Sequence, residues 1–170
     1  MPIPAGYTSG QIVQAVVGTG KILQVVSTAK TDTFTTTSTS YTDVTGLSVS
    51  ITPISTTSKI LVFAQISGAD AFGTSAGWVQ LVRGSTAIDV GDTAGSRISV
   101  SGQFSSPYSS ALNSISLSFL DSPATTSATT YKIQARTYSG SVYVNRSQSD
   151  SDSSTFARGA SNITVMEVSA

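Results

Sequence analysis

The most constraining feature of this chain is a segment in which apolar and polar residues alternate strictly. In GLSVSIT (residues 46–52), Leu47, Val49 and Ile51 share one face of an extended strand, and hydroxyl side chains share the other. Pro53 has no N–H to donate, so it ends the strand, and STTS (residues 55–58) favours a turn. The segment predicts a strand with one buried face and one wet face, followed by a turn.

A second strand is predicted at residues 59–66, and it is apolar on both faces. One face carries Ile60, Val62, Ala64 and Ile66. Leu61 and Phe63 occupy the opposite face. Two arrangements fit this pattern: a central strand with the core on one side and a neighbouring subunit on the other, or the middle layer of a sandwich.

The remainder of the chain repeats short alternating runs separated by turn residues, without any period of 3.6 residues. Further strands are expected at residues 78–83, 86–90, 97–100, 112–120, 131–138, 142–145 and 162–168. Ser and Thr make up roughly a third of the sequence, which suits strands and turns. The pattern of roughly nine or ten strands at a spacing of about 8 to 12 residues predicts an all-β protein, an antiparallel β-sandwich.

We expect one domain, because 170 residues suffice to bury a core without disulfides. The β-sandwich is expected at residues 20–170, after an extended N-terminal arm at residues 1–19 that contains Pro2 and Pro4. The pattern G-x-I-[V/L]-Q-x-V occurs twice, at residues 10–16 and 20–26. Either both copies form similar strands joined by a turn, or the first copy adds a strand to a partner protein.

Composition excludes several kinds of function. Nine basic and nine acidic residues give zero net charge, which argues against binding to nucleic acid or to an anionic membrane. The longest apolar run, residues 60–64, is far shorter than the roughly 20 residues that span a bilayer. Without Cys or His, the sequence contains no thiol nucleophile, no Ser-His-Asp triad and none of the usual zinc sites.

The acidic residues form no motif that is specific for catalysis or for metal binding. Asp92-Thr-Ala-Gly matches an aspartic-protease triplet, but a turn capped by Asp explains it better. Asp150-Ser-Asp152 lacks the third acidic position of a calcium loop, so a solvated polar loop is the expected structure. We predict no enzymatic activity, no cofactor and no metal site; a glycosidase pair formed by Asp89 and Asp92 is the remaining enzymatic alternative.

Three aromatic residues lie in loops rich in Gly and Ser: Phe72, Phe104 and Tyr108. On the surface, such rings would stack on sugars or contact a partner. Alternatively, they tuck under the loops and extend the core.

The successive segments TGLSVSIT, SKILVFAQISG, WVQLVRGSTAI, SISLSFLDSP, TTYKIQARTY and ITVMEV follow an order that resembles the jelly roll of the C1q and tumour-necrosis-factor class. Residues 20–68, together with ARGASNITVMEV near the C-terminus, resemble a family of tailed-bacteriophage virion proteins. Members of this family occur as tail-fibre heads, appendages and small capsid-surface proteins. The resemblance implies a trimeric jelly roll on a virion surface, assembled in the host cytoplasm.

The resemblance also implies which residues make contacts. The residues predicted to form the trimer interface are Leu61, Phe63, Tyr131 and Ile133. The arm residues predicted to dock on another virion protein, such as the major capsid protein or a fibre or baseplate protein, are Ile3, Tyr7, Ile12 and Val13.

Two functions follow from this resemblance. The first is a capsid decoration or cement protein, which the short chain favours because it has no heptads and no stalk. The second is the tip of a tail fibre, which would recognise a host surface glycan through the loops at residues 68–77 and 101–110.

Overall fold

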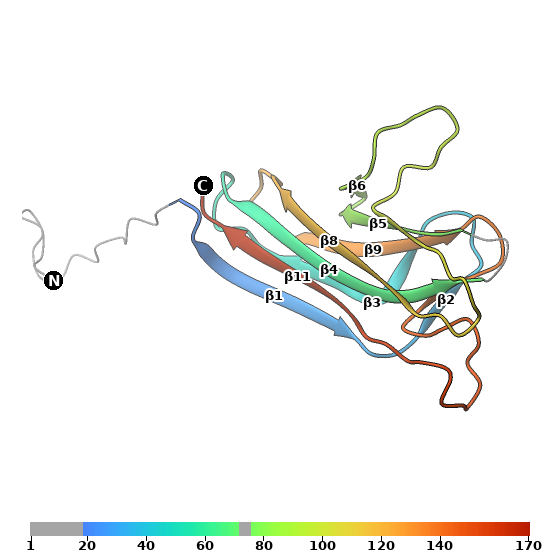
Figure 1. The fold of residues 1–170 in the computed structure, drawn as a ribbon. Coiled ribbons are helices and arrows are strands. Elements are labelled where there is room, and N and C mark those ends of the chain that lie inside the picture. The colour runs from blue at the N-terminus through green and yellow to red at the C-terminus, as the bar shows by residue number, and fades with distance from the viewer. Residues whose placement is uncertain (1–18, 72–75) are drawn as a thin grey trace, which may run out of the picture.

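The structure, a computed structural model, describes residues 19–71 and 76–170. The described residues form an antiparallel β-sandwich, which confirms the predicted fold class. Figure 1 shows its two sheets stacked one behind the other. The strands are β1 (Ile22–Lys30), β2 (Phe34–Thr36), β3 (Thr42–Ile51), β4 (Lys59–Asp70), β5 (Gly77–Arg83), β6 (Thr86–Ile88), β7 (Gly102–Phe104), β8 (Asn113–Asp121), β9 (Thr129–Thr137), β10 (Val142–Val144) and β11 (Ser161–Val168).

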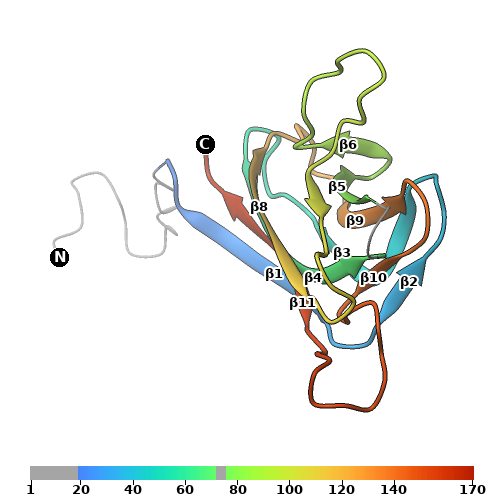
Figure 2. The ribbon, with the colours of Figure 1, turned by 45° about the vertical axis from the view of Figure 1, so that its right-hand side comes forward.

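Sheet A has the order β1-β11-β4-β10-β2, and β8 pairs with the other edge of β4. Sheet B has the order β3-β9-β5-β6, and β7 also pairs with β5. The long strands from β3 to β11 alternate between the two sheets along the chain, a connectivity compatible with a jelly roll. The view in Figure 2 separates the two sheets and shows the loop between β6 and β7 projecting from sheet B.

The core lies between the sheets and is built by the alternating residues of the longest strands. In β3, Leu47, Val49 and Ile51 are buried as the alternation predicts. The face of β4 that carries Ile60, Val62, Ala64 and Ile66 is also buried. No described residue forms a helix, so none provides a helix long and apolar enough to cross a membrane.

Strand β4 is longer than predicted and ends at Asp70, four residues into the expected loop. Its last residues are small because the chain packs tightly there. A Cβ on Gly68 would lie 2.7 Å from the Phe104 ring and would also collide with the carbonyl oxygen of Tyr143. Gly68 therefore lets β10 and β7 approach β4 closely.

Two local predictions in the second half are wrong. No strand forms at residues 97–100; instead β7 begins at Gly102, within a segment predicted to be a loop. Short runs of this kind are poorly determined by periodicity, because three residues of pairing depend on the neighbouring strand. Here β5 provides that neighbour, and Gly77 pairs with Phe104.

Candidate functional site

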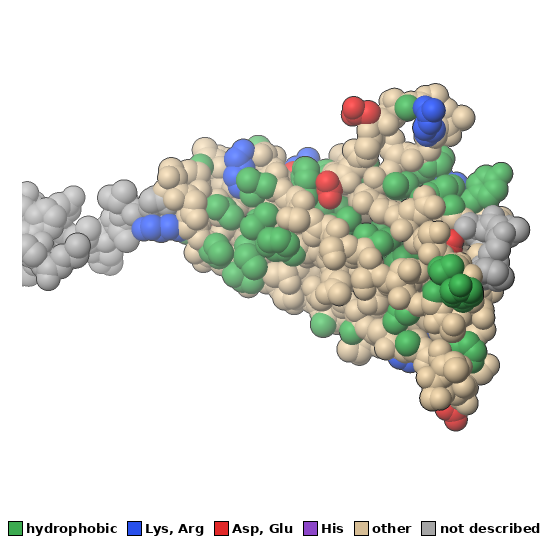
Figure 3. Space-filling view, in the orientation of Figure 1, with side chains coloured by type: hydrophobic (Ala, Val, Ile, Leu, Met, Phe, Trp, Pro, Cys, Tyr) green, Lys and Arg blue, Asp and Glu red, His purple; other side chains and the backbone are tan. Residues whose placement is uncertain are grey.

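The outer face of sheet A carries a continuous row of apolar side chains. In the register of the sheet, Leu61 of β4 lies between Leu120 of β8 and Met166 of β11, and Met166 pairs in turn with Val25 of β1. Cross-strand partners share a face, so these four side chains form one row across four strands. Figure 3 shows hydrophobic side chains gathered on this face.

Several of these side chains are strongly exposed to solvent. Val25 and Leu120 are 54% and 53% exposed. Phe63, the next residue of β4 after Leu61 that faces outward, is 40% exposed. We call the row of Val25, Leu61, Leu120 and Met166, together with Phe63, the sheet-A stripe. Contiguous exposed apolar side chains of this kind mark an interaction surface more often than a solvated one.

Polar pairs border the stripe, and Lys59 is the one charged residue among them. On one side, the hydroxyl groups of Ser27 and Thr164 lie 2.8 Å apart. At the opposite end, Lys59 Nζ donates a hydrogen bond of 2.7 Å to Ser122 Oγ. The stripe itself contains no charged residue, so a second apolar surface can cover it without desolvating an ion.

The structure separates the four residues predicted to form a trimer interface. Leu61 and Phe63 do face outward from sheet A, as predicted. Tyr131 and Ile133 lie on β9 with 0% exposure, packed into the core between the sheets, so they cannot contact a neighbouring subunit. That half of the prediction is wrong because the apolar face of β9 is needed to close the sandwich.

The predicted loop aromatics have different environments. Phe104 is fully buried and joins the core, so the alternative in which it packs beneath its loop is the correct one. Tyr108 is 69% exposed, as a surface contact requires. Phe72 lies outside the described residues, and so do the predicted docking residues Ile3, Tyr7, Ile12 and Val13.

Among the acidic candidates, Asp150 makes an ordinary structural contact. Both carboxylate oxygens of Asp150 accept hydrogen bonds of 2.8 Å from Arg158, which closes the loop between β10 and β11. Within the part of the chain that the structure describes, no three acidic side chains gather as a metal site would require. Partial burial raises the pKa of Asp89.

Sequence reasoning missed the members of the stripe that come from other strands. Val25, Leu120 and Met166 each occur in a strand whose pattern appears ordinary by itself. Only the pairing register brings them beside Leu61. Comparison of the sequence with protein-family models and with curated proteins finds no match.

Proposed function

We propose that this chain is a structural protein of a bacteriophage particle, in which three copies associate through their sheet-A stripes and decorate the capsid surface. The observation that carries the proposal is the stripe, an uncharged apolar row that spans all four long strands of one sheet. The virion assignment itself rests on the resemblance of residues 20–68 to phage virion proteins.

A second copy of the same chain suits the stripe better than a partner of different chemistry. Side chains that line a rotation axis meet their own copies in the other subunits, so a stripe at the axis must tolerate its own charges. The stripe has none, and the chain as a whole carries zero net charge. Association of identical copies through the stripe itself therefore brings no like charges together, and Lys59 lies at its border.

Within this proposal, capsid decoration is the first function and the tip of a tail fibre is the second. A cement protein stabilises a capsid by burying apolar area between subunits, which an outward apolar face permits. In both cases, the arm at residues 1–19 is the predicted attachment to another virion protein.

Immunogold electron microscopy of purified particles tests this proposal, with an antibody raised against the chain. Labelling distributed over the capsid supports a decoration protein, and labelling confined to the tail tip supports a fibre head. Unlabelled particles would contradict the virion assignment, provided that the antibody recognises the purified folded protein.

A further inference from the structure

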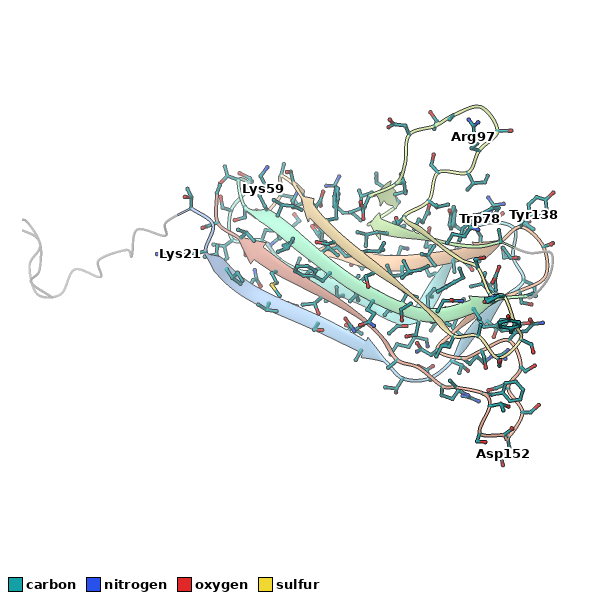
Figure 4. The ribbon with its side chains drawn as sticks, in the orientation of Figure 1. Lys21, Lys59, Trp78, Arg97, Tyr138 and Asp152 are labelled. Atoms are coloured by element: carbon teal, nitrogen blue, oxygen red, sulfur yellow. The ribbon has the colours of Figure 1, made fainter. Side chains whose placement is uncertain are left out.

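The outer face of sheet B, on the opposite side of the sandwich from the stripe, carries a cluster of aromatic and polar side chains at one end. Gln103 of β7 pairs with Trp78 of β5, and Trp78 pairs with Arg136 of β9. Tyr41, the residue immediately before β3, lies beside Arg136. We call these four residues, together with Tyr138, the sheet-B cluster. Figure 4 shows Trp78 and Tyr138 side by side, below the loop that carries Arg97.

Arg136 is held between two aromatic rings. Its Cζ lies 5.3 Å from the centre of the Trp78 ring and 5.6 Å from that of Tyr41, within the range of cation–π contacts. Among the described residues, its guanidinium donates to no partner: no hydrogen bond or ion pair engages it, and its Nε is buried and unsatisfied. A guanidinium has five donors in a planar fork, so Arg136 retains unused hydrogen-bonding capacity and an unpaired charge.

Tyr138 provides an exposed ring beside this charge. The ring is 68% exposed, yet its position is defined because it packs edge-on against Trp78, with ring centres 6.3 Å apart and planes at 79°. Trp78 is fixed in turn, since its Nε1 donates a hydrogen bond of 3.1 Å to Gln103 Oε1. The Gln103 amide nitrogen then points to no described acceptor and remains a free donor.

The next row of the sheet continues the polar surface. Gln80 Nε2 donates to Gln134 Oε1 at 2.7 Å, and Gln134 Nε2 donates to Asp43 Oδ1, also at 2.7 Å. Lys132 binds the other carboxylate oxygen of Asp43 at 2.8 Å. The charges of Asp43 and Lys132 therefore offset each other, and among the described residues of this face Arg136 has no ionic partner.

A surface hollow of about 380 Å³ lies beyond this row, lined by residues that include Asp43, Gly46 and Lys132. It forms where β3 loses register with β9 between Asp43 and Ser48, a bulge at which Gly46 has a φ of +81°. From Tyr138 to Lys132, the strand advances about 20 Å at about 3.3 Å per residue. The face is thus long enough for an extended ligand.

We propose that the outer face of sheet B binds an acidic saccharide, with its carboxylate on Arg136. The apolar face of a sugar ring would lie against Tyr138 and Trp78, since aromatic rings offer a flat, amphipathic surface. Hydroxyl groups would bond the amides of Gln80 and Gln103, whose orientations are already fixed. A carboxylate matches the fork of Arg136 in charge and geometry. This inference is independent of the virion assignment.

The single tryptophan of the chain makes the site directly observable. Trp78 lies in the cluster, so its fluorescence should change in a saturable manner when ligand binds. A glycan array of carboxylated oligosaccharides, each printed beside its carboxyl-reduced counterpart, selects the probe, and fluorescence titration then measures its affinity. We expect a Kd of about 1 mM or tighter for the acidic form, and binding at least about tenfold weaker for the reduced form.

Two substitutions and a matched control complete the test. Tyr138→Ala should weaken binding about tenfold, and Ile54→Ala, which removes an equally exposed apolar side chain in the turn between β3 and β4, should leave it unchanged. Arg136→Gln should remove the preference for the acidic form. The inference is overturned if no carboxylated sugar is retained, if reduced sugars bind equally, or if Ile54→Ala weakens binding as much as Tyr138→Ala. Native mass of each variant shows whether assembly is intact, so failure of this site is distinguishable from failure of the proposed trimer.

Discussion

The hydroxyl group of Tyr131 lies 2.6 Å from Asp121 Oδ2 and links sheet B to sheet A through the buried core. The same carboxylate accepts hydrogen bonds of 2.7 and 2.9 Å from Nη1 of Arg83, on β5. Burial raises the pKa of Tyr131 well above its usual value, and the hydrogen bond to Asp121 raises it further. The three residues hold β5, β8 and β9 together by charge-assisted contacts.

Tyr131→Phe should therefore lower the free energy of unfolding by about 1–3 kcal/mol, because Asp121 loses a hydrogen bond while it stays buried. Denaturation with urea measures the change, and Tyr108→Phe is the matched control, since Tyr108 is exposed. Equal midpoints for the two variants would show that the link between the sheets contributes nothing to stability.

Asn145 joins three segments of the chain. We expect its substitution to lower the free energy of unfolding more than that of any other polar residue outside the sheets. Its Nδ2 donates hydrogen bonds of 2.9 Å to the carbonyls of Lys30 and Asp32, and its Oδ1 accepts one of 2.6 Å from Ser161. It is fully buried and has a φ of +63°, which Asn and Gly tolerate better than other residues.

Asn145→Ala should cost about 3 kcal/mol or more, through the lost hydrogen bonds and the left-handed backbone. Asn145→Gly loses the same hydrogen bonds but relaxes the backbone, so it should be the more stable of the two by about 1 kcal/mol. Thermal unfolding of both variants measures this difference in stability. An alanine variant as stable as the glycine variant would contradict the backbone part of this account.

Glu167 is a buried carboxylate that fixes the turn between β3 and β4. Burial acts to raise its pKa, but hydrogen bonds from Gln24, Ser58 and the backbone of Ile54 and Ser55 outweigh burial and lower it. Gln24 Nε2 lies 2.6 Å from Oε2, and the Ile54 N–H lies 2.8 Å from Oε1.

Because the folded-state pKa of Glu167 is lowered, its contribution to stability is present above the unfolded pKa of about 4.3 and is lost as the pH falls through the folded value. Glu167 is the only glutamate in the sequence, so a glutamate-selective ¹³C label gives one carboxyl resonance to titrate. We expect the midpoint of this titration to lie below the unfolded value of about 4.3, because the folded-state pKa is lowered. A midpoint above that value would mean that burial outweighs the hydrogen bonds.

Periodicity was sufficient to predict the core but not the contacts between strands. The alternation in β3, β4 and β9 correctly predicted which residues share a face, because side chains alternate in every strand. It could not show that the apolar face of β9, with Tyr131 and Ile133, packs inside the sandwich rather than against a neighbouring subunit. Strand order decides that question, and strand order is not encoded in any one segment.

The sheet-B cluster shows the same limit. Its residues come from four parts of the sequence, and each part contributes one or two aromatic or polar side chains to a strand. Phe104 illustrates the reverse case, because its loop appears exposed in the sequence while the ring fills the space above Gly68. Both outcomes depend on register, which local composition does not specify.

A charge introduced at the centre or edge of the sheet-A stripe should weaken the proposed association between subunits. Leu120→Lys is expected to dissociate the proposed trimer while the subunit stays folded, because Leu120 is 53% exposed and contributes little to the core. Ile98→Lys, at an exposed position in the loop between β6 and β7, is the control and should leave the mass unchanged. Sedimentation velocity of the two variants measures the effect; dissociation by both, or by neither, would show that assembly does not depend on the stripe.

Native mass spectrometry of the purified, unmodified chain tests the central claim most directly. Each chain has a mass of 17.4 kDa, so association through the sheet-A stripe around a threefold axis predicts a single species of about 52 kDa. A species of 17.4 kDa at every concentration, with the stripe open to solvent, would contradict assembly of this chain through sheet A.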